Sequence, residues 1–284
     1  EKFQEAKKAY TAWMDFTGEE DPKVYTRIAQ ANYQLGQFRD VFKPADKAIS
    51  LQKEPNKAPY QLKLGSYFEL KDYANMVKIG EEIVRVWPDD KKAWVSLGKY
   101  YLQTEDYSKG LATMEVAFKN GYFEAEVDYK VLSNFYSLNE IPFKAAKTLE
   151  NAIKEDKVKR TKQNVNAIAS NYHRSKDIEK AAKYYEEAAK FDDDAELYRK
   201  AGSLLLQSEN FSAAVVRLNK ALELGSDKKG TIYSDLAEAY YYQAKYKQAY
   251  AAITKAMDDP RTRKFAKGWS TFIKDKAARN GVKI

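Results

Sequence analysis

Hydrophobic residues along this chain recur at the spacing of amphipathic helices. Ala181, Tyr185 and Ala188 fall at positions i, i+4 and i+7, which places them on one helical face. Short polar pairs such as Glu105-Asp106 and Lys176-Asp177 separate one hydrophobic stretch from the next. The pattern predicts a chain made almost wholly of helices joined by short turns.

One arrangement of residues returns several times. In its clearest copy the first helix carries Trp94, Leu97-Gly98 and Tyr101, and the second carries Gly110, Met114 and Ala117-Phe118. Other copies contain Tyr198, Ala201-Gly202 and Ala221-Leu222, or Tyr233, Leu236-Ala237 and Ala256-Met257. Sequence repeats with a fixed period indicate an array of small units that pack on their neighbours.

These copies resemble the tetratricopeptide repeat (TPR), in which a large–Leu–Gly–Tyr helix precedes an Ala–Phe–Ala helix. Seven complete copies begin near Pro22, Lys57, Lys91, Glu126, Lys162, Ala195 and Gly230. Their spacing is close to the family period of about 34 residues. The resemblance implies an all-α fold, a right-handed TPR superhelix (α-solenoid) of about seven full repeats over residues 22–260. A partial N-terminal repeat and a C-terminal capping helix complete it.

The second repeat departs from the pattern. It has Lys63-Leu64 where the Leu-Gly pair is expected, and its own Leu64-Gly65 pair comes one residue late. We expect its first helix to be rotated or shifted by one residue.

The two ends differ from the repeats between them. Residues 1–16 carry Phe3, Ala6, Tyr10 and Trp13, which predicts the second helix of a partial repeat whose first helix precedes Glu1. The alternative is a lone capping helix. Residues 261–284 predict a basic capping helix and tail, with Phe265, Trp269, Phe272 and Ile273 on one face. An incomplete first repeat leaves an apolar face, so a homodimer formed through end repeats is a further expectation.

Charge is concentrated at the C-terminus. The 284 residues carry a net charge of +8, but residues 261–284 hold eight lysines and arginines against Asp275 alone. The rest of the chain is nearly neutral, which argues against a basic groove for nucleic acid. The basic tail is either a solvated surface or a contact for an acidic partner, membrane headgroups or an envelope polymer.

No residue pattern predicts catalysis. The chain has no cysteine and a single histidine, His173, so it cannot build a thiolate or multi-histidine zinc site. It lacks a glycine-rich phosphate loop and the nucleophile and metalloprotease motifs. No run approaches the ~18 apolar residues of a transmembrane segment. We therefore expect no enzyme activity, no cofactor, no metal and no transmembrane segment.

The TPR resemblance implies that the first helices line a groove for a protein or peptide partner. The positions of the family's groove predict these partner-binding residues: Gln30, Tyr33, Gln61, Phe68, Lys99, Lys130, Asn134, Asn166, His173, Arg174, Arg199, Glu238, Tyr241 and Tyr242. Lys130 and Asn134 match positions that grip a C-terminal carboxylate in chaperone-binding members, whereas Asn166 and Arg199 fall one residue off that pattern. A carboxylate clamp, a general polar peptide groove and a solvated face all remain open.

A narrower resemblance is to the TPR proteins encoded beside TonB–ExbB–ExbD systems of Gram-negative bacteria. It rests on the continuous array, the Tyr-, Asn- and Lys-rich composition, the absence of cysteine and the terminal helix that contains Trp269. It implies a periplasmic scaffold that supports TonB-dependent outer-membrane transport by contacting the TonB complex or an outer-membrane receptor. The alternatives are a cytoplasmic adaptor or co-chaperone that reads partner C-terminal tails, and an envelope-polymer binder acting through the basic tail.

Overall fold

The computed structural model describes residues 2–284, and these contain helices and turns but no strand. The first eight α-helices are α1 (Lys2–Thr17), α2 (Pro22–Gln34), α3 (Phe42–Leu51), α4 (Lys57–Glu69), α5 (Tyr73–Val86), α6 (Lys91–Gln103), α7 (Tyr107–Lys119) and α8 (Glu126–Leu138). The others are α9 (Pro142–Lys154), α10 (Lys162–Arg174), α11 (Ile178–Ala189), α12 (Ala195–Gln207), α13 (Phe211–Glu223), α14 (Lys229–Tyr242), α15 (Tyr246–Ala256) and α16 (Arg263–Arg279). A short 3-10 helix, η1 (Phe38–Val41), precedes α3. The predicted all-α fold is confirmed.

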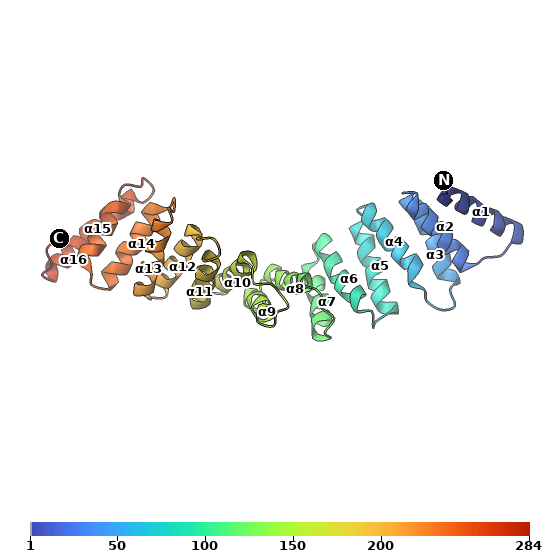
Figure 1. The fold of residues 1–284 in the computed structure, drawn as a ribbon, viewed down its shortest axis with the longest axis horizontal. Helices are drawn as coiled ribbons and strands as arrows, with labels where there is room; N and C mark the ends of the chain where they lie inside the picture. The colour runs from blue at the N-terminus through green and yellow to red at the C-terminus, as the bar shows by residue number, and fades with distance from the viewer. Residues whose placement is uncertain (1) are drawn as a thin grey trace. The chain divides into compact units, whose positions relative to one another are not determined.

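From α1 to α7, and again from α9 to α16, helices that are neighbours in sequence are also neighbours in space (Figure 1). Most contacts between helices join one helix to the next along the chain, as expected for an array in which each unit packs only on its neighbours. The chain divides into an N-terminal part, residues 2–135, and a C-terminal part, residues 136–284. Each part is described by itself below.

The turn inside each helix pair is set by two residues. Asp106 and Asp177 cap α7 and α11 by accepting a hydrogen bond from the backbone N–H three residues later. The residues before them, Glu105 and Lys176, have φ angles of 56° and 61°. That left-handed conformation ends the preceding helix and reverses the chain. Each polar pair predicted as a turn is therefore a left-handed residue followed by a helix cap. Pro142 opens α9, at a helix position where its missing N–H group costs no hydrogen bond.

Small residues let the two helices of a pair cross closely. Gly202 of α12 lies against α13, and a Cβ atom added there would be 2.7 Å from Leu218 Cγ and 3.2 Å from the Leu218 backbone nitrogen. Gly98 of α6 meets Met114 of α7 in the same way. Ala169 and Ala237 hold the matching places on α10 and α14, and both are fully buried. A larger side chain at these sites would separate helices that are packed at close range.

The small residues of the second repeat face a different neighbour. A Cβ atom added at Gly65 of α4 would lie 3.0 Å from the Tyr33 ring of α2, the first helix of the preceding repeat. Ser66 is the fully buried small residue of this helix. The one-residue shift expected from Leu64-Gly65 stays a prediction.

The terminal helices are less buried than those between them. None of the described residues of α1 is buried, and Phe16 at its end is 91% exposed. In α16 the buried residues are Ala266, Ile273 and Ala277. The rings of Phe265 and Phe272 both contact Trp269, as their predicted common face implies. Phe265 and Phe272 remain half exposed, whereas Ile273 is fully buried.

Two glycine substitutions should have opposite effects on stability. We expect Gly202→Ala to destabilise the protein by about 1–3 kcal/mol, because its Cβ would overlap Leu218. Gly268→Ala in α16 meets no atom within 4 Å, so it should stabilise the protein by up to about 1 kcal/mol through helix propensity. Urea unfolding followed by circular dichroism measures both. Equal shifts in the same direction would contradict this account of the close helix crossing.

Candidate functional site

The fourteen predicted partner-binding residues all keep exposed surface. None is buried: Gln61, Phe68, Asn134, His173, Arg174 and Tyr242 are exposed, and the other eight are partly exposed. Their surroundings differ, however, and these differences separate residues that are already bonded within the chain from residues that are open to a partner.

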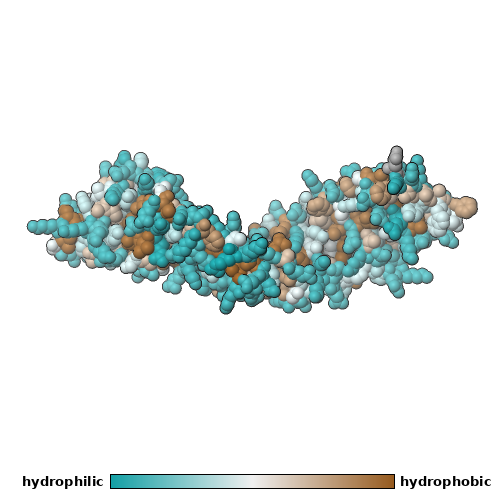
Figure 2. Space-filling model, viewed as in Figure 1, coloured by the Kyte–Doolittle hydropathy of each residue, from teal (hydrophilic) through white to brown (hydrophobic). Residues whose placement is uncertain are grey.

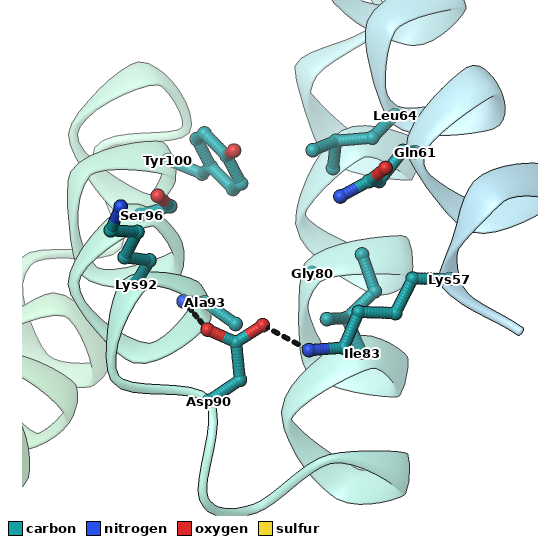
Figure 3. A pocket seen from close by; sticks show the side chains of 10 residues that line it. All are labelled: Lys57, Gln61, Leu64, Gly80, Ile83, Asp90, Lys92, Ala93, Ser96 and Tyr100. Atoms are coloured by element: carbon teal, nitrogen blue, oxygen red, sulfur yellow. Dashed lines mark hydrogen bonds and ion pairs between the residues drawn. The ribbon is translucent and has the colours of Figure 1, made fainter.

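In the N-terminal part, Gln61 lines a small pocket of about 160 Å³ formed by α4, α5 and α6 (Figure 3). Lys57 Nζ donates to Asp90 Oδ2 across this pocket at 2.6 Å, and Asp90 also caps α6 by accepting from the Ala93 N–H. Burial would raise the pKa of Asp90, but Lys57 and the backbone N–H groups outweigh it and hold the pKa below its ordinary value. This pocket is small, and its polar groups tie one repeat to the next.

The same tie recurs in the C-terminal part. Lys162 begins α10 and donates to Asp194, the cap of α12, at 2.7 Å, and also to Asp192 at 2.8 Å. Lys57 and Lys162 hold equivalent places, each being the first residue of a first helix. The lysine therefore joins successive first helices in both parts of the chain.

Most predicted cations are paired with carboxylates of the chain itself. Lys99 contacts Asp128 at 2.7 Å, Lys130 contacts Glu126, and Arg174 contacts Glu140 at 3.1 Å. Arg199 donates to both carboxylate oxygens of Glu196, at 2.8 and 2.7 Å. A partner carboxylate would have to displace these internal partners. Such competition makes a carboxylate clamp less favourable than a site whose polar groups are open.

The predicted amides and the histidine have no carboxylate partner among residues 2–284, although Gln30 Oε1 accepts a hydrogen bond from Arg27 at 3.0 Å. Asn134 is exposed, and Asn166 has a buried Oδ1 atom without a hydrogen-bond partner. His173 is exposed, with its ring 6.2 Å from that of Tyr185. Within the described residues no group of three histidine, aspartate or glutamate side chains is arranged to hold a metal ion.

Glu150 lies at the centre of a polar cluster, and a partly buried carboxylate with several hydrogen-bond donors is an arrangement also found in catalytic sites. It accepts hydrogen bonds from Tyr172 at 2.6 Å, Tyr184 at 2.8 Å and Lys147 at 2.9 Å. Burial would raise its pKa, but these three donors lower it to about 2. The pKa values of both tyrosines are raised, chiefly by burial and then by Glu150. A permanently ionised carboxylate beside neutral tyrosines joins α9, α10 and α11 and has little capacity for proton transfer near pH 7.

The C-terminal part contains an open cleft between α12 and α14. Its volume is about 460 Å³, and it is lined by Ser203, Leu206, Gln207, Glu209, Phe211, Glu238 and Tyr242. Glu238 and Tyr242 were predicted from the sequence as partner-binding residues, but the other five were not. These five lie in α12, in the turn after it and at the start of α13, and the cleft that they share forms only when two repeats pack.

Carboxyl groups dominate the polar chemistry of this cleft. Asp235 lies one turn before Glu238 and accepts a hydrogen bond from Ser203 Oγ at 2.6 Å. Burial raises the pKa of Asp235. The pKa of Glu238 is also raised, first by burial and then by the nearby charge of Asp235. These two carboxyls lie in surroundings that disfavour their own negative charge.

An aromatic belt adjoins the cleft, which we define as Phe211, Tyr241, Tyr242, Phe265, Trp269 and Phe272. Phe211 stacks on Tyr242 with ring centroids 5.0 Å apart, and Tyr241 contacts Tyr242 at 5.5 Å. Tyr241 also contacts Trp269 at 5.8 Å and Phe272 at 5.3 Å, both in α16. On the face drawn in Figure 2, hydrophobic side chains show among hydrophilic ones over the C-terminal helices. The belt offers apolar surface directly beside the carboxyl-lined cleft.

Comparison with solved structures identifies the fold. YrrB, described as a TPR protein with an unusual peptide-binding site, matches with a TM-score of 0.51 and 14% identity, over 68% of this chain and 97% of that one. The chain has a TPR-type fold. A second match, in the structure of Naa15/Naa10 bound to HypK-THB, has a TM-score of 0.63 and 17% identity. It covers 98% of this chain but only 45% of the other.

Sequence comparison adds no relative to this result. The chain matches no protein-family model and no curated protein. At these identities the structural matches establish the fold and leave the partner undetermined. Among residues 2–284 no helix combines the length and apolar character that crossing a bilayer requires.

The Glu150 cluster should make stability depend on pH in acid. The folded pKa is about 2 and the ordinary value is 4.5, so the unfolded chain binds the proton more readily. The contribution of Glu150 is therefore complete above pH 4.5 and is lost as the pH falls towards 2. We expect Glu150→Gln to lower the urea midpoint more at pH 6 than at pH 3. A difference that stays constant between these pH values would show that the carboxylate is not held ionised by the fold.

Proposed function

We propose that this chain is a non-catalytic protein-interaction scaffold that holds an extended segment of a partner on the exposed faces of its first helices. The observation that carries the proposal is the cleft between α12 and α14, whose open wall is aromatic and whose carboxyl Glu238 lines it. Exposed tyrosines are common at protein interfaces because they bury large areas at a low cost in conformational entropy. YrrB, which shares the fold, is described as having a peptide-binding site.

The narrower part of the proposal concerns place and partner. We propose that the scaffold works in the periplasm and supports TonB-dependent outer-membrane transport by contacting the TonB complex or an outer-membrane receptor. Its support is the compositional resemblance of the sequence. A homodimer formed through the end repeats stays a separate proposal, which the exposed Phe16 at the end of α1 favours.

Two other functions remain as alternatives. A cytoplasmic adaptor would read partner C-terminal tails through Lys130, Asn134 and Arg199, but Lys130 and Arg199 already pair with Glu126 and Glu196. An envelope-polymer binder would act through residues 261–284, whose charge makes its affinity strongly dependent on salt.

Affinity capture from separate periplasmic and cytoplasmic extracts of the source organism tests the proposal. We expect Tyr242→Ala to bind the captured partner with about 30-fold lower affinity than wild type. This is the typical effect of truncating an aromatic residue at the centre of an interface. Val216→Ala is the matched control, because Val216 is 60% exposed but lies on the second helix α13. Phe68→Ala tests the N-terminal part in the same way.

The identity and compartment of the captured protein decide between the alternatives. TonB-system or outer-membrane proteins from the periplasmic extract would support the narrower proposal, and chaperones from the cytoplasmic extract would support the adaptor. Equal capture by wild type, Tyr242→Ala and Phe68→Ala would contradict binding on the first helices.

A further inference from the structure

The carboxyl group of Glu238 can accept a hydrogen bond or ion pair from a ligand in the cleft between α12 and α14. It lines the cleft between α12 and α14, yet it forms no hydrogen bond and no ion pair with any of residues 2–284. Burial in the cleft and the neighbouring Asp235 both raise its pKa. A carboxyl in such surroundings gains most from a cation that arrives from outside the chain.

The nearest cations of the chain do not fill this role. Arg199 is held by both oxygens of Glu196, and its side chain is only 15% exposed. Lys228 contacts the same Glu196 carboxylate at 3.3 Å. Glu196 therefore binds both cations. The charge of Arg199 still lowers the pKa of Asp235 without forming an ion pair with it, and Glu238 has no ion pair among the described residues.

The cleft wall suits the alkyl stem of a long basic side chain. Tyr242 is 57% exposed and stacks on Phe211, so its ring is held in place while it remains accessible. Lysine and arginine side chains lay their methylene groups along apolar surface, and their charged heads are attracted to aromatic faces. Ring and carboxyl are both lining residues of the same cleft of about 460 Å³.

The aromatic belt gives the partner a second feature. Phe265 and Phe272 are half exposed. Phe272 contacts Tyr241 directly, and Phe265 contacts Trp269, which in turn contacts Tyr241, the neighbour of Tyr242. Surfaces lined with aromatic rings accept proline-rich or other apolar extended segments, whose preformed shape loses little entropy on binding. Apolar residues next to the basic side chain would lie on this belt.

We infer that the cleft between α12 and α14 is a binding site for a lysine or arginine side chain, presented by an extended partner segment whose neighbouring residues are prolines or other apolar residues. The head group contacts Glu238, its stem lies on Tyr242, and the flanking residues lie on Tyr241 and the rings of α16. This inference rests on the proposed function and names the chemistry of its ligand.

Three synthetic peptides test the inference with the full chain. Each is a fluorescein-labelled, nine-residue proline-rich peptide with one tryptophan, and they differ at one central position: lysine, uncharged norleucine of similar shape, or glutamate. Fluorescence anisotropy at low salt should show the lysine peptide binding about tenfold more tightly than the norleucine peptide. That ratio is expected from one hydrogen bond to a charged group. The glutamate peptide should bind most weakly.

Variants then locate the cause of this preference. Glu238→Gln keeps the shape of the side chain and should bring the lysine and norleucine affinities within about twofold of each other. Glu238→Lys should reverse the order and favour the glutamate peptide. Glu179→Gln is the matched control, since Glu179 is an exposed glutamate on α11 and should retain the lysine preference. Circular dichroism confirms that each variant is folded before its affinity is compared.

The outcomes separate this inference from the proposed function. The inference is overturned if wild type binds the lysine and norleucine peptides with equal affinity, or binds none of the three peptides. Retention of the lysine advantage in Glu238→Gln overturns it as well. The scaffold proposal survives either result if partner capture still depends on Tyr242, and it falls only if capture ignores the first helices.

Discussion

Close crossing of helices at small residues is the constraint on which the rest of this structure depends. Gly202 against Leu218 and Gly98 against Met114 leave no room for a Cβ atom, and Ala169 and Ala237 are fully buried at the matching places. Because these contacts bury one face of each first helix, the opposite face remains at the surface. The packing of the repeats therefore determines which side chains a partner can reach.

Electrostatic pairing then decides which of the exposed groups can serve a partner. Lys57 with Asp90 and Lys162 with Asp194 link successive first helices, while Lys99, Lys130, Arg174 and Arg199 have carboxylate partners of their own. Exposed pairs of this kind contribute little to stability, typically about 0–1 kcal/mol. Their larger effect is on recognition, since a partner's carboxylate must compete with the carboxylates that already pair with these lysines and arginines.

Local features of the fold could be predicted from the sequence, whereas the site could not. The turn at Lys176-Asp177 depends on two adjacent residues, one left-handed and one a helix cap, so the sequence contains it entirely. The ion pair between Arg199 and Glu196 could also be predicted, because the two residues are three positions apart on one helix. Lys99 with Asp128 and Ser203 with Asp235 join residues of different repeats, so only packing reveals them. The half exposure of Phe265 and Phe272 likewise appears only in the folded chain, where Ala266, Ile273 and Ala277 are the buried residues of α16.

Net charge is consequently a poor guide to what this chain binds. The protein carries +8, yet the cleft between α12 and α14 has two glutamates and no cation among its lining residues, and the excess positive charge lies in residues 261–284. Charges exposed to solvent are screened over about 8 Å at physiological salt, so the groups within a few ångströms of the ligand decide which ligand is preferred. A repeat fold with many paired side chains can thus gain specificity from a few unpaired ones. Glu238 and the rings beside it are such a set, and they lie where two first helices and the terminal helix meet.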